Sequence, residues 1–157
     1  MIDRFEKFSL AIWEISRCWN KIASDEMEKY GLKAPFAVYF TSMARLDKGI
    51  TAAKLAELCS RDKAEISRAI NLMEQKGLVS RSGAQAHYRA LIQLTEEGKK
   101  LSALITEKAM LAVELGGMGL SDEQRHTFYE ALELIADNLR RVSRLGLERE
   151  ENTECLE

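Results

Sequence analysis

The sequence has 157 residues, of which 46% are hydrophobic and 31% charged, and it contains nine glycines and one proline. This composition excludes a disordered or collagen-like chain, and a chain of this length can bury a substantial core without a disulfide or a metal. The formal net charge of −2 gives no overall attraction to nucleic acid, so any basic surface has to come from a local excess of Lys and Arg.

No segment has the features of a membrane span or a leader. The longest run without a charged residue, 34–44, is too short to cross a bilayer. The first residues mix both charges with apolar side chains and lack the uncharged core of a secretory signal. Cys18, Cys59 and Cys155 share no short spacing, which fits a reducing compartment better than a disulfide framework or a metal site. We therefore expect a cytoplasmic protein with no membrane segment, metal or cofactor.

The N-terminal segment has apolar residues at alternating steps of three and four, the pattern of a helix that packs along another helix. The pattern predicts a long helix that ends near Gly31, whose missing Cβ suits a left-handed C-terminal residue. A second helix begins at Pro35, continues to Leu46 and is followed by a turn at 47–49. The apolar positions of the first helix are Phe5, Phe8, Ile12, Ile15, Trp19 and Ile22.

Two short helices joined by a three-residue turn are predicted next, which makes a helix-turn-helix candidate. Thr51 is the N-cap of the first, in which Leu55 and Leu58 are expected to face inward. Asp62 is the N-cap of the second, and Glu65 three residues later gives the pattern of a capping box. The inward stripe of the second helix, which ends at Gly77, is Ile66, Ile70 and Met73.

A hairpin and two more helices complete the pattern. Strands are predicted over 78–82 and 88–94, with a turn between them. Thr95 caps the helix that follows, and a cluster of glycines at 116–119 ends it. Ser121 and Gln124 form a capping box for the last helix. Its apolar residues, again at steps of three and four, are Phe128, Leu132, Ile135, Leu139 and Val142.

This order of elements is that of a winged helix-turn-helix flanked by long helices, a mainly α fold with a small β-hairpin wing. We expect a single domain over 1–157 that ends in an acidic tail, 146–157. Its winged core is 34–98, and the helices at 2–31 and 99–145 have apolar stripes longer than one small domain needs to bury. They are therefore expected to pair with a second copy of the chain.

Short motifs follow one another in the core: Leu55-Ala56-Glu57, Ser67-Arg68, Met73-Glu74-Gln75-Lys76-Gly77-Leu78-Val79, Arg89 and Leu94-Thr95-Glu96-Glu97-Gly98. In this order and spacing, with long helices on both sides, the segment resembles the multiple antibiotic resistance regulator (MarR) family of winged-helix repressors. The resemblance implies a homodimeric transcriptional regulator that binds a palindromic operator in double-stranded DNA. One recognition helix per subunit would enter the major groove and the wing would reach the minor groove. Members of the family often respond to a small-molecule effector.

The residues themselves favour the same surface. The stretch 61–89 has six basic and three acidic residues, a local charge of +3. The helix after Asp62 has small or polar residues opposite its inward stripe, and Arg and Asn can form bidentate contacts with bases. Arg89 matches the wing arginine of the family, and Arg81 is a candidate phosphate contact. The predicted DNA-binding residues are Lys63, Ala64, Ser67, Arg68, Asn71, Arg81 and Arg89.

Two positions depart from the family pattern. His87 stands where an Asp usually precedes the wing arginine, which removes the carboxylate that would hold Arg89. Leu72 stands where many relatives have a basic residue. These two residues and the net negative charge also permit an alternative function, a dimeric protein-interaction module that has lost strong DNA binding.

An effector pocket and a redox site are weaker hypotheses. Aromatic residues on the first two helices could line an apolar effector cleft, although aromatics at helical spacing are more often core. Cys18 is the redox candidate because Arg17 and Lys21 are close in sequence, and its alternative role is a small apolar filler. No phosphate loop, nucleophile elbow or isolated carboxylate pair is present in the sequence, so an enzyme is not expected. The pocket candidates are Trp13, Trp19, Phe36, Tyr39 and Phe40.

Overall fold

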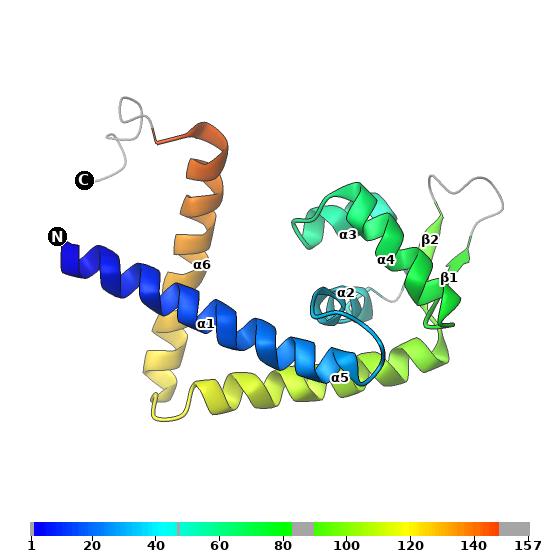
Figure 1. Cartoon of the computed structure of the whole chain (residues 1–157), viewed down its shortest axis with the longest axis horizontal. Helices are drawn as coiled ribbons and strands as arrows, with labels where there is room; N and C mark the ends of the chain where they lie inside the picture. Colours follow the sequence, from blue (N-terminus) through cyan, green and yellow to red (C-terminus); the bar gives the residue numbers. More distant parts are fainter. Residues whose placement is uncertain (1, 47, 83–89, 148–157) are drawn as a thin grey trace. The chain divides into compact units, whose positions relative to one another are not determined.

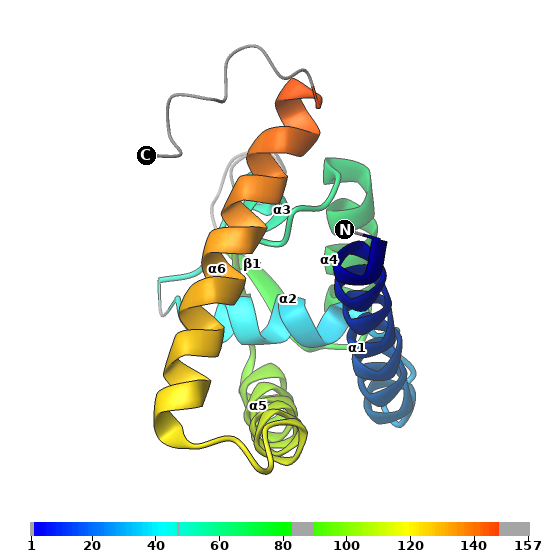
Figure 2. The ribbon, with the colours of Figure 1, turned by 90° about the vertical axis from the view of Figure 1, so that its left-hand side faces the viewer.

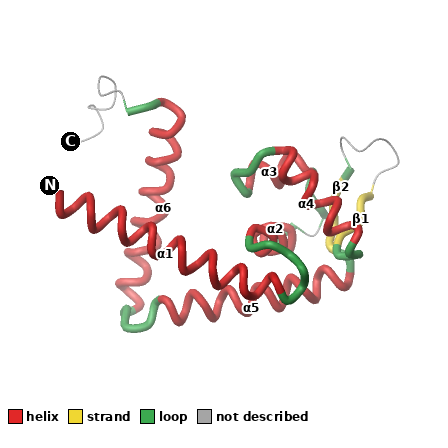
Figure 3. The backbone as a smooth tube through the Cα atoms, in the orientation of Figure 1, coloured by secondary structure: helices red, strands yellow, loops and turns green. Residues whose placement is uncertain are grey.

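The computed structural model describes residues 2–46, 48–82 and 90–147, which form two compact units, Met1–Val113 and Glu114–Glu157. The described residues are mainly helical, and their strands form one antiparallel hairpin (Figure 3). This confirms the predicted fold class. The elements in chain order are α1 (Ile2–Glu28), α2 (Pro35–Ala44), α3 (Ala52–Leu58), α4 (Lys63–Gln75), β1 (Val79–Ser82), β2 (Leu91–Leu94), α5 (Glu96–Gly116) and α6 (Asp122–Leu145) (Figure 1).

Local signals fix the end of α1 and the start of α2. Gly31 has a φ of +64°, and the N–H of Leu32 donates to the carbonyl of Met27 at 3.1 Å, which closes the last turn of α1. Pro35 is the first residue of α2, where a missing N–H costs nothing. Among the described helices, none combines the length and the apolar composition that a bilayer crossing requires.

The helix-turn-helix has the predicted caps. The side chain of Thr51 accepts from the N–H of Lys54 at 3.3 Å, and Asp62 Oδ1 accepts from the N–H of Glu65 at 2.7 Å. The Glu65 side chain does not complete a capping box, because it accepts a hydrogen bond from a core tyrosine instead. The inward position expected for Leu58 is also wrong: its side chain is 51% exposed, since α3 ends there and the chain turns away.

The core of the first unit is built around α2. In both Figure 1 and Figure 2, α2 lies between α5 on one side and the pair of α3 and α4 on the other. Ser102 of α5, which is buried, donates from its hydroxyl to the carbonyl of Phe40 at 3.2 Å and so joins the two helices. The largest fully buried side chains are Tyr39, Phe40, Met27, Leu55, Ile66, Ile70 and Met73.

The hairpin is attached to the helices at its base. β1 pairs with β2 so that Val79 is opposite Leu94, and Ile50 forms a bridge with Ile92 on the other edge of β2. Thr95 donates from its hydroxyl to the carbonyl of Gly77 at 2.7 Å and accepts from the N–H of Gly98 at 3.1 Å. These bonds fix the start of α5 against the end of α4. The upper part of the predicted wing, 83–89, lies outside the described residues.

The second unit is dominated by α6. The predicted capping box is present: Ser121 accepts from the N–H of Gln124 at 3.2 Å, and the Gln124 side chain accepts from the N–H of Ser121 at 2.9 Å. None of the residues of α6, all of which are described, is buried. Its apolar stripe remains open to solvent, with Phe128, Leu132 and Leu139 between 44% and 50% exposed.

Candidate nucleic-acid interface

The candidate interface is the exposed face of α4. Four apolar side chains of α4 are buried, and they anchor the helix in the core of the first unit. This leaves the opposite side of the helix free, as the spacing predicts. Five of the residues predicted to bind DNA lie exposed on α4: Lys63, Ala64, Ser67, Arg68 and Asn71.

The first turn of α4 is held to the core by a second contact besides its cap. The Tyr39 hydroxyl donates to Glu65 Oε1 at 2.8 Å, and Arg61 Nη1 lies 3.6 Å from the same oxygen. Burial raises the pKa of Tyr39 to about 12, and the hydrogen bond to the Glu65 carboxylate acts in the same direction. Sequence reasoning missed this contact, because the capping pattern assigned the Glu65 side chain to the helix end.

The base of the wing contacts the same helix. Arg81 of β1 lies against α4, with its Nε 3.2 Å from Glu74 Oε2 and its Nη2 donating to Asn71 Oδ1. The Arg81 side chain is only 22% exposed. The structure therefore joins two of the predicted DNA-binding residues to each other. The remaining wing candidate, Arg89, and its neighbour His87 lie outside the described residues.

Ion pairing divides the basic residues of this region into two groups. Arg61 and Arg81 have carboxylate partners on α4, which neutralise part of their charge. Within the described part of the chain, neither Lys63 nor Arg68 forms an ion pair. These two cations are therefore the ones that the α4 face offers to an anionic partner.

Two further residues of the helix-turn-helix, Leu72 and Cys59, pack against the core. Leu72 is partly buried and packs against the core, so the described structure gives it a packing role. Cys59 packs against the same core, and its sulfur lies 3.7 Å from the hydroxyl oxygen of Ser42.

A cavity of about 220 Å³ lies within the first unit. It is lined by apolar residues of α1, α2 and α5, with Arg61 and Lys108 among its few charged groups. Of the aromatic residues predicted to form a pocket, Trp19 lines it, whereas Trp13 is 62% exposed on α1. The structure places the other three in the core and not at the cavity: Phe36, Tyr39 and Phe40.

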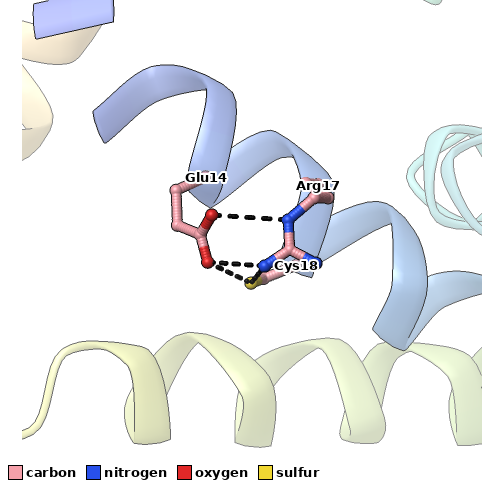
Figure 4. A network of polar contacts seen from close by, with 3 residues as sticks. All are labelled: Glu14, Arg17 and Cys18. Atoms are coloured by element: carbon pink, nitrogen blue, oxygen red, sulfur yellow. Dashed lines mark hydrogen bonds and ion pairs between the residues drawn. The ribbon is translucent and has the colours of Figure 1, made fainter. Parts of the chain in front are cut away.

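Cys18 is exposed on α1 and has two polar neighbours (Figure 4). Arg17 Nη2 donates to Glu14 Oε1 at 2.6 Å, and the Cys18 thiol lies 3.6 Å from the same oxygen. The hydrogen bond from Arg17 lowers the pKa of Glu14, and the pair raises the pKa of Arg17. The charge that was expected to activate the thiol is therefore paired with a carboxylate, and the redox role stays a prediction. Among the described residues, no cluster of His, Cys, Asp or Glu could hold a metal.

The sequence is similar to that of a known helix-turn-helix regulator. No family model matches the sequence. A helix-turn-helix transcriptional regulator of Bacillus subtilis, the uncharacterized YybA, is 24% identical over 128 residues, which are 81% of this chain and 85% of that protein.

Solved structures share the fold over nearly the whole chain. A MarR transcriptional regulator from Methanosarcina mazei is 26% identical, with a TM-score of 0.75 over 87% of this chain and 92% of the other. The MepR–DNA complex of S. aureus has a TM-score of 0.75 at 22% identity, over 84% of this chain and 97% of the other. Together with the exposed face of α4 and the hairpin after it, these relationships identify the fold as that of the MarR/SlyA family of winged-helix transcriptional regulators.

Proposed function

We propose that this protein is a sequence-specific DNA-binding regulator that occupies a palindromic operator as a homodimer and represses transcription. The observation that carries the proposal is the division of α4, which buries its whole apolar stripe and leaves polar and basic side chains free. A helix of this kind suits the major groove, where hydrogen-bond donors and acceptors of the base edges are exposed. The S. aureus relative of the same fold was crystallised with DNA.

Arg68 tests the DNA-binding part of the proposal. In a fluorescence anisotropy titration with the DNA upstream of its own gene, wild-type affinity should fall steeply with salt, because Lys and Arg contacts release counterions from the phosphates. Arg68→Ala should lower the affinity by about tenfold or more. Arg141→Ala removes the same charge from α6 and should bind like wild type. Binding that is absent, or that is insensitive to salt, would favour the protein-interaction alternative instead.

Two apolar stripes that are not buried support the proposed dimer. On α1 the exposed apolar side chains include Phe8, Ile12 and Ile22, and α6 has none that is buried. Helices with such stripes are stable when the stripe packs against another surface, and a second copy of the chain carries the same stripes. In such a dimer the two α4 helices would reach half-sites about one helical turn apart. Sedimentation velocity should therefore give a dimer at micromolar concentration, and a monomer would contradict the proposal.

The cavity supports control by a small, mainly apolar effector. Arg61 lines the cavity and also pairs with Glu65, which lies in the first turn of α4. A ligand that displaces the Arg61 side chain would therefore disturb the contact that positions the recognition helix. The sequence has two tryptophans, so in Trp13→Phe the remaining signal comes from Trp19 at the cavity.

Fluorescence of Trp13→Phe can screen a panel of small aromatic compounds. A true effector should change Trp19 emission and lower DNA affinity at the same concentrations. Compounds that change the emission and leave DNA binding intact would show a cavity with no regulatory role.

A further inference from the structure

The contact between β1 and α4 has a consequence for base recognition. Asn71 and Glu74 are three residues apart, so they lie on the same side of α4, and Arg81 of the wing strand reaches both. For an arginine next to a proposed DNA interface, Arg81 is well covered, with 22% of its side chain exposed. Its guanidinium is thus held between two side chains of the recognition helix.

The chemistry of the two groups fixes the orientation of the Asn71 amide. A guanidinium has five N–H donors and no acceptor, and an asparagine amide has one oxygen that accepts and one nitrogen that donates. The atom that meets Arg81 therefore has to be Oδ1, as the hydrogen bond from Nη2 shows. Oδ1 keeps a second lone pair, but it faces Arg81, so the amide nitrogen with its two N–H donors is the part of Asn71 that points away from this contact.

We infer that Arg81 is a specificity-determining positioning residue, which holds Asn71 as a hydrogen-bond donor toward the major groove. The inference rests on the proposed function, in which the exposed face of α4 reads DNA. The usual pairing of asparagine with adenine uses both the amide oxygen and the amide nitrogen. With its oxygen facing Arg81, Asn71 suits base edges that present acceptors and no donor, which are N7 and O6 of guanine and O4 of thymine, whereas adenine places the N6 donor beside its N7 acceptor.

This role differs from the phosphate contact that the sequence suggested for Arg81. Glu74 already lies against the guanidinium and compensates its charge, so a phosphate would have to compete with that carboxylate. A phosphate contact contributes to the salt dependence of binding and carries no sequence information. A positioning residue alters base preference and leaves the salt dependence unchanged.

The experiment is a selection of bound sequences from a randomised duplex pool, with four forms of the full-length protein. Asn71→Ala identifies the base position that Asn71 reads. The double variant Arg81→Met/Glu74→Gln removes one positive and one negative charge, so the net charge stays the same. Asn71→Asp keeps the contact with Arg81 and presents an acceptor in place of the donor. Salt titrations of the wild type and the double variant on the selected site complete the set.

Wild type should prefer guanine or thymine at that position by about tenfold, the range of a good side-chain-to-base contact. In the double variant this preference should fall to about threefold or less or move to adenine, while the other positions keep theirs and the salt slope is unchanged. Asn71→Asp should move the preference to cytosine, whose N4 group donates.

Three results would overturn the assignment. The first is an unchanged base preference in the double variant, and the second is a salt slope flatter by about 1 per subunit, which is the mark of a lost phosphate contact. The third does not depend on the variants and is a freely reorienting Asn71 amide in wild-type protein, measured by 15N relaxation of the side chain without DNA. A wild type that selects no sequence at all would overturn the proposed function together with this inference.

Discussion

Two amphipathic helices of this chain, α4 and α6, have opposite relations to solvent. The inward apolar stripe of α4 is buried in the core of the first unit, so the exposed surface of the helix is mainly polar. None of the apolar residues of α6 is buried in the described structure, so its exposed surface includes an apolar stripe. A helix whose apolar stripe is buried within its own chain can offer polar groups to a polar partner. A helix whose apolar stripe is exposed needs another apolar surface to cover it. In the proposed function, the same kind of pattern serves recognition in one unit and association in the other.

The largest expected effect on stability concerns the core that buries the apolar stripe of α4. Leu55→Ala, at a residue with no exposed surface, should lower the free energy of unfolding by about 3 kcal/mol, because the side chain loses its burial and leaves a cavity. Leu58→Ala is the matched control on the same helix, where half of the side chain is exposed, and should cost less than about 1 kcal/mol. Urea unfolding monitored by circular dichroism measures both. Equal costs would mean that the two side chains are equally covered.

Substitutions in the exposed apolar stripe of α6 should weaken dimer formation and leave the stability of the winged core unchanged. Leu132→Asp removes an apolar side chain from each copy of α6 in the proposed dimer, and burying one leucine contributes about 1.5–3 kcal/mol. The dissociation constant from sedimentation velocity should therefore rise about a hundredfold or more. Arg141→Asp places the same carboxylate on the side of α6 that carries Glu130, Glu133 and Asp137, and it should leave the dimer intact. A Leu132→Asp protein that remains a dimer would show that α6 is not part of the interface.

Local features of this fold could be predicted from the sequence. The caps at Thr51, Asp62 and Ser121 and the left-handed Gly31 depend on the chemistry of a few neighbouring residues, and the structure has each of them. The inward stripe of α4 follows from helical periodicity in the same way. The exposure of five residues on its other face could therefore be predicted from the sequence.

Contacts between distant segments could not be predicted in this way. Periodicity places Phe36 and Tyr39 on one side of a helix, but it does not say whether that side meets a core or a cleft, and the structure places both in the core. The pairing of Arg81 with Asn71 depends on how β1 turns back along α4. The exposure of Leu58 could not be predicted, because a seven-residue helix is too short for its apolar pattern to determine the burial of its last residue.

Titration of Tyr39 tests how firmly α4 is held to the core. The pKa of Tyr39 is about 12 in the folded protein, mainly because of burial, and its ordinary value is 10.0. Above pH 10 the unfolded chain loses this proton and the folded chain does not, so the free energy of unfolding should fall as the pH rises from 10 to 12. The loss should reach about 2 kcal/mol.

Tyr39→Phe should remove this pH dependence and, at pH 7, lower the free energy of unfolding by about 1 kcal/mol through the lost hydrogen bond to Glu65. Chemical unfolding at a series of alkaline pH values measures both effects. Tyr30→Phe, at an exposed position, is the control and should follow the wild-type profile. A Tyr39→Phe protein that keeps the wild-type alkaline loss would assign that loss to another group.

The smallest expected effect on stability is at the N-cap of α4. Two substitutions of Asp62 distinguish the contribution of its hydrogen bond from that of its negative charge. Asp62 Oδ1 accepts from the N–H of Glu65, so Asp62→Ala should cost about 1 kcal/mol of stability. Asp62→Asn keeps an oxygen acceptor without the negative charge, and it should retain most of that stability. Ser121→Ala removes the corresponding bond from α6, where it should weaken the helix without changing the position of α4. If the cap positions the recognition helix, DNA affinity should fall with Asp62→Ala and recover with Asp62→Asn. If affinity instead rises equally in both variants, the carboxylate acts mainly by repelling phosphate, because both changes remove the same negative charge from the proposed interface.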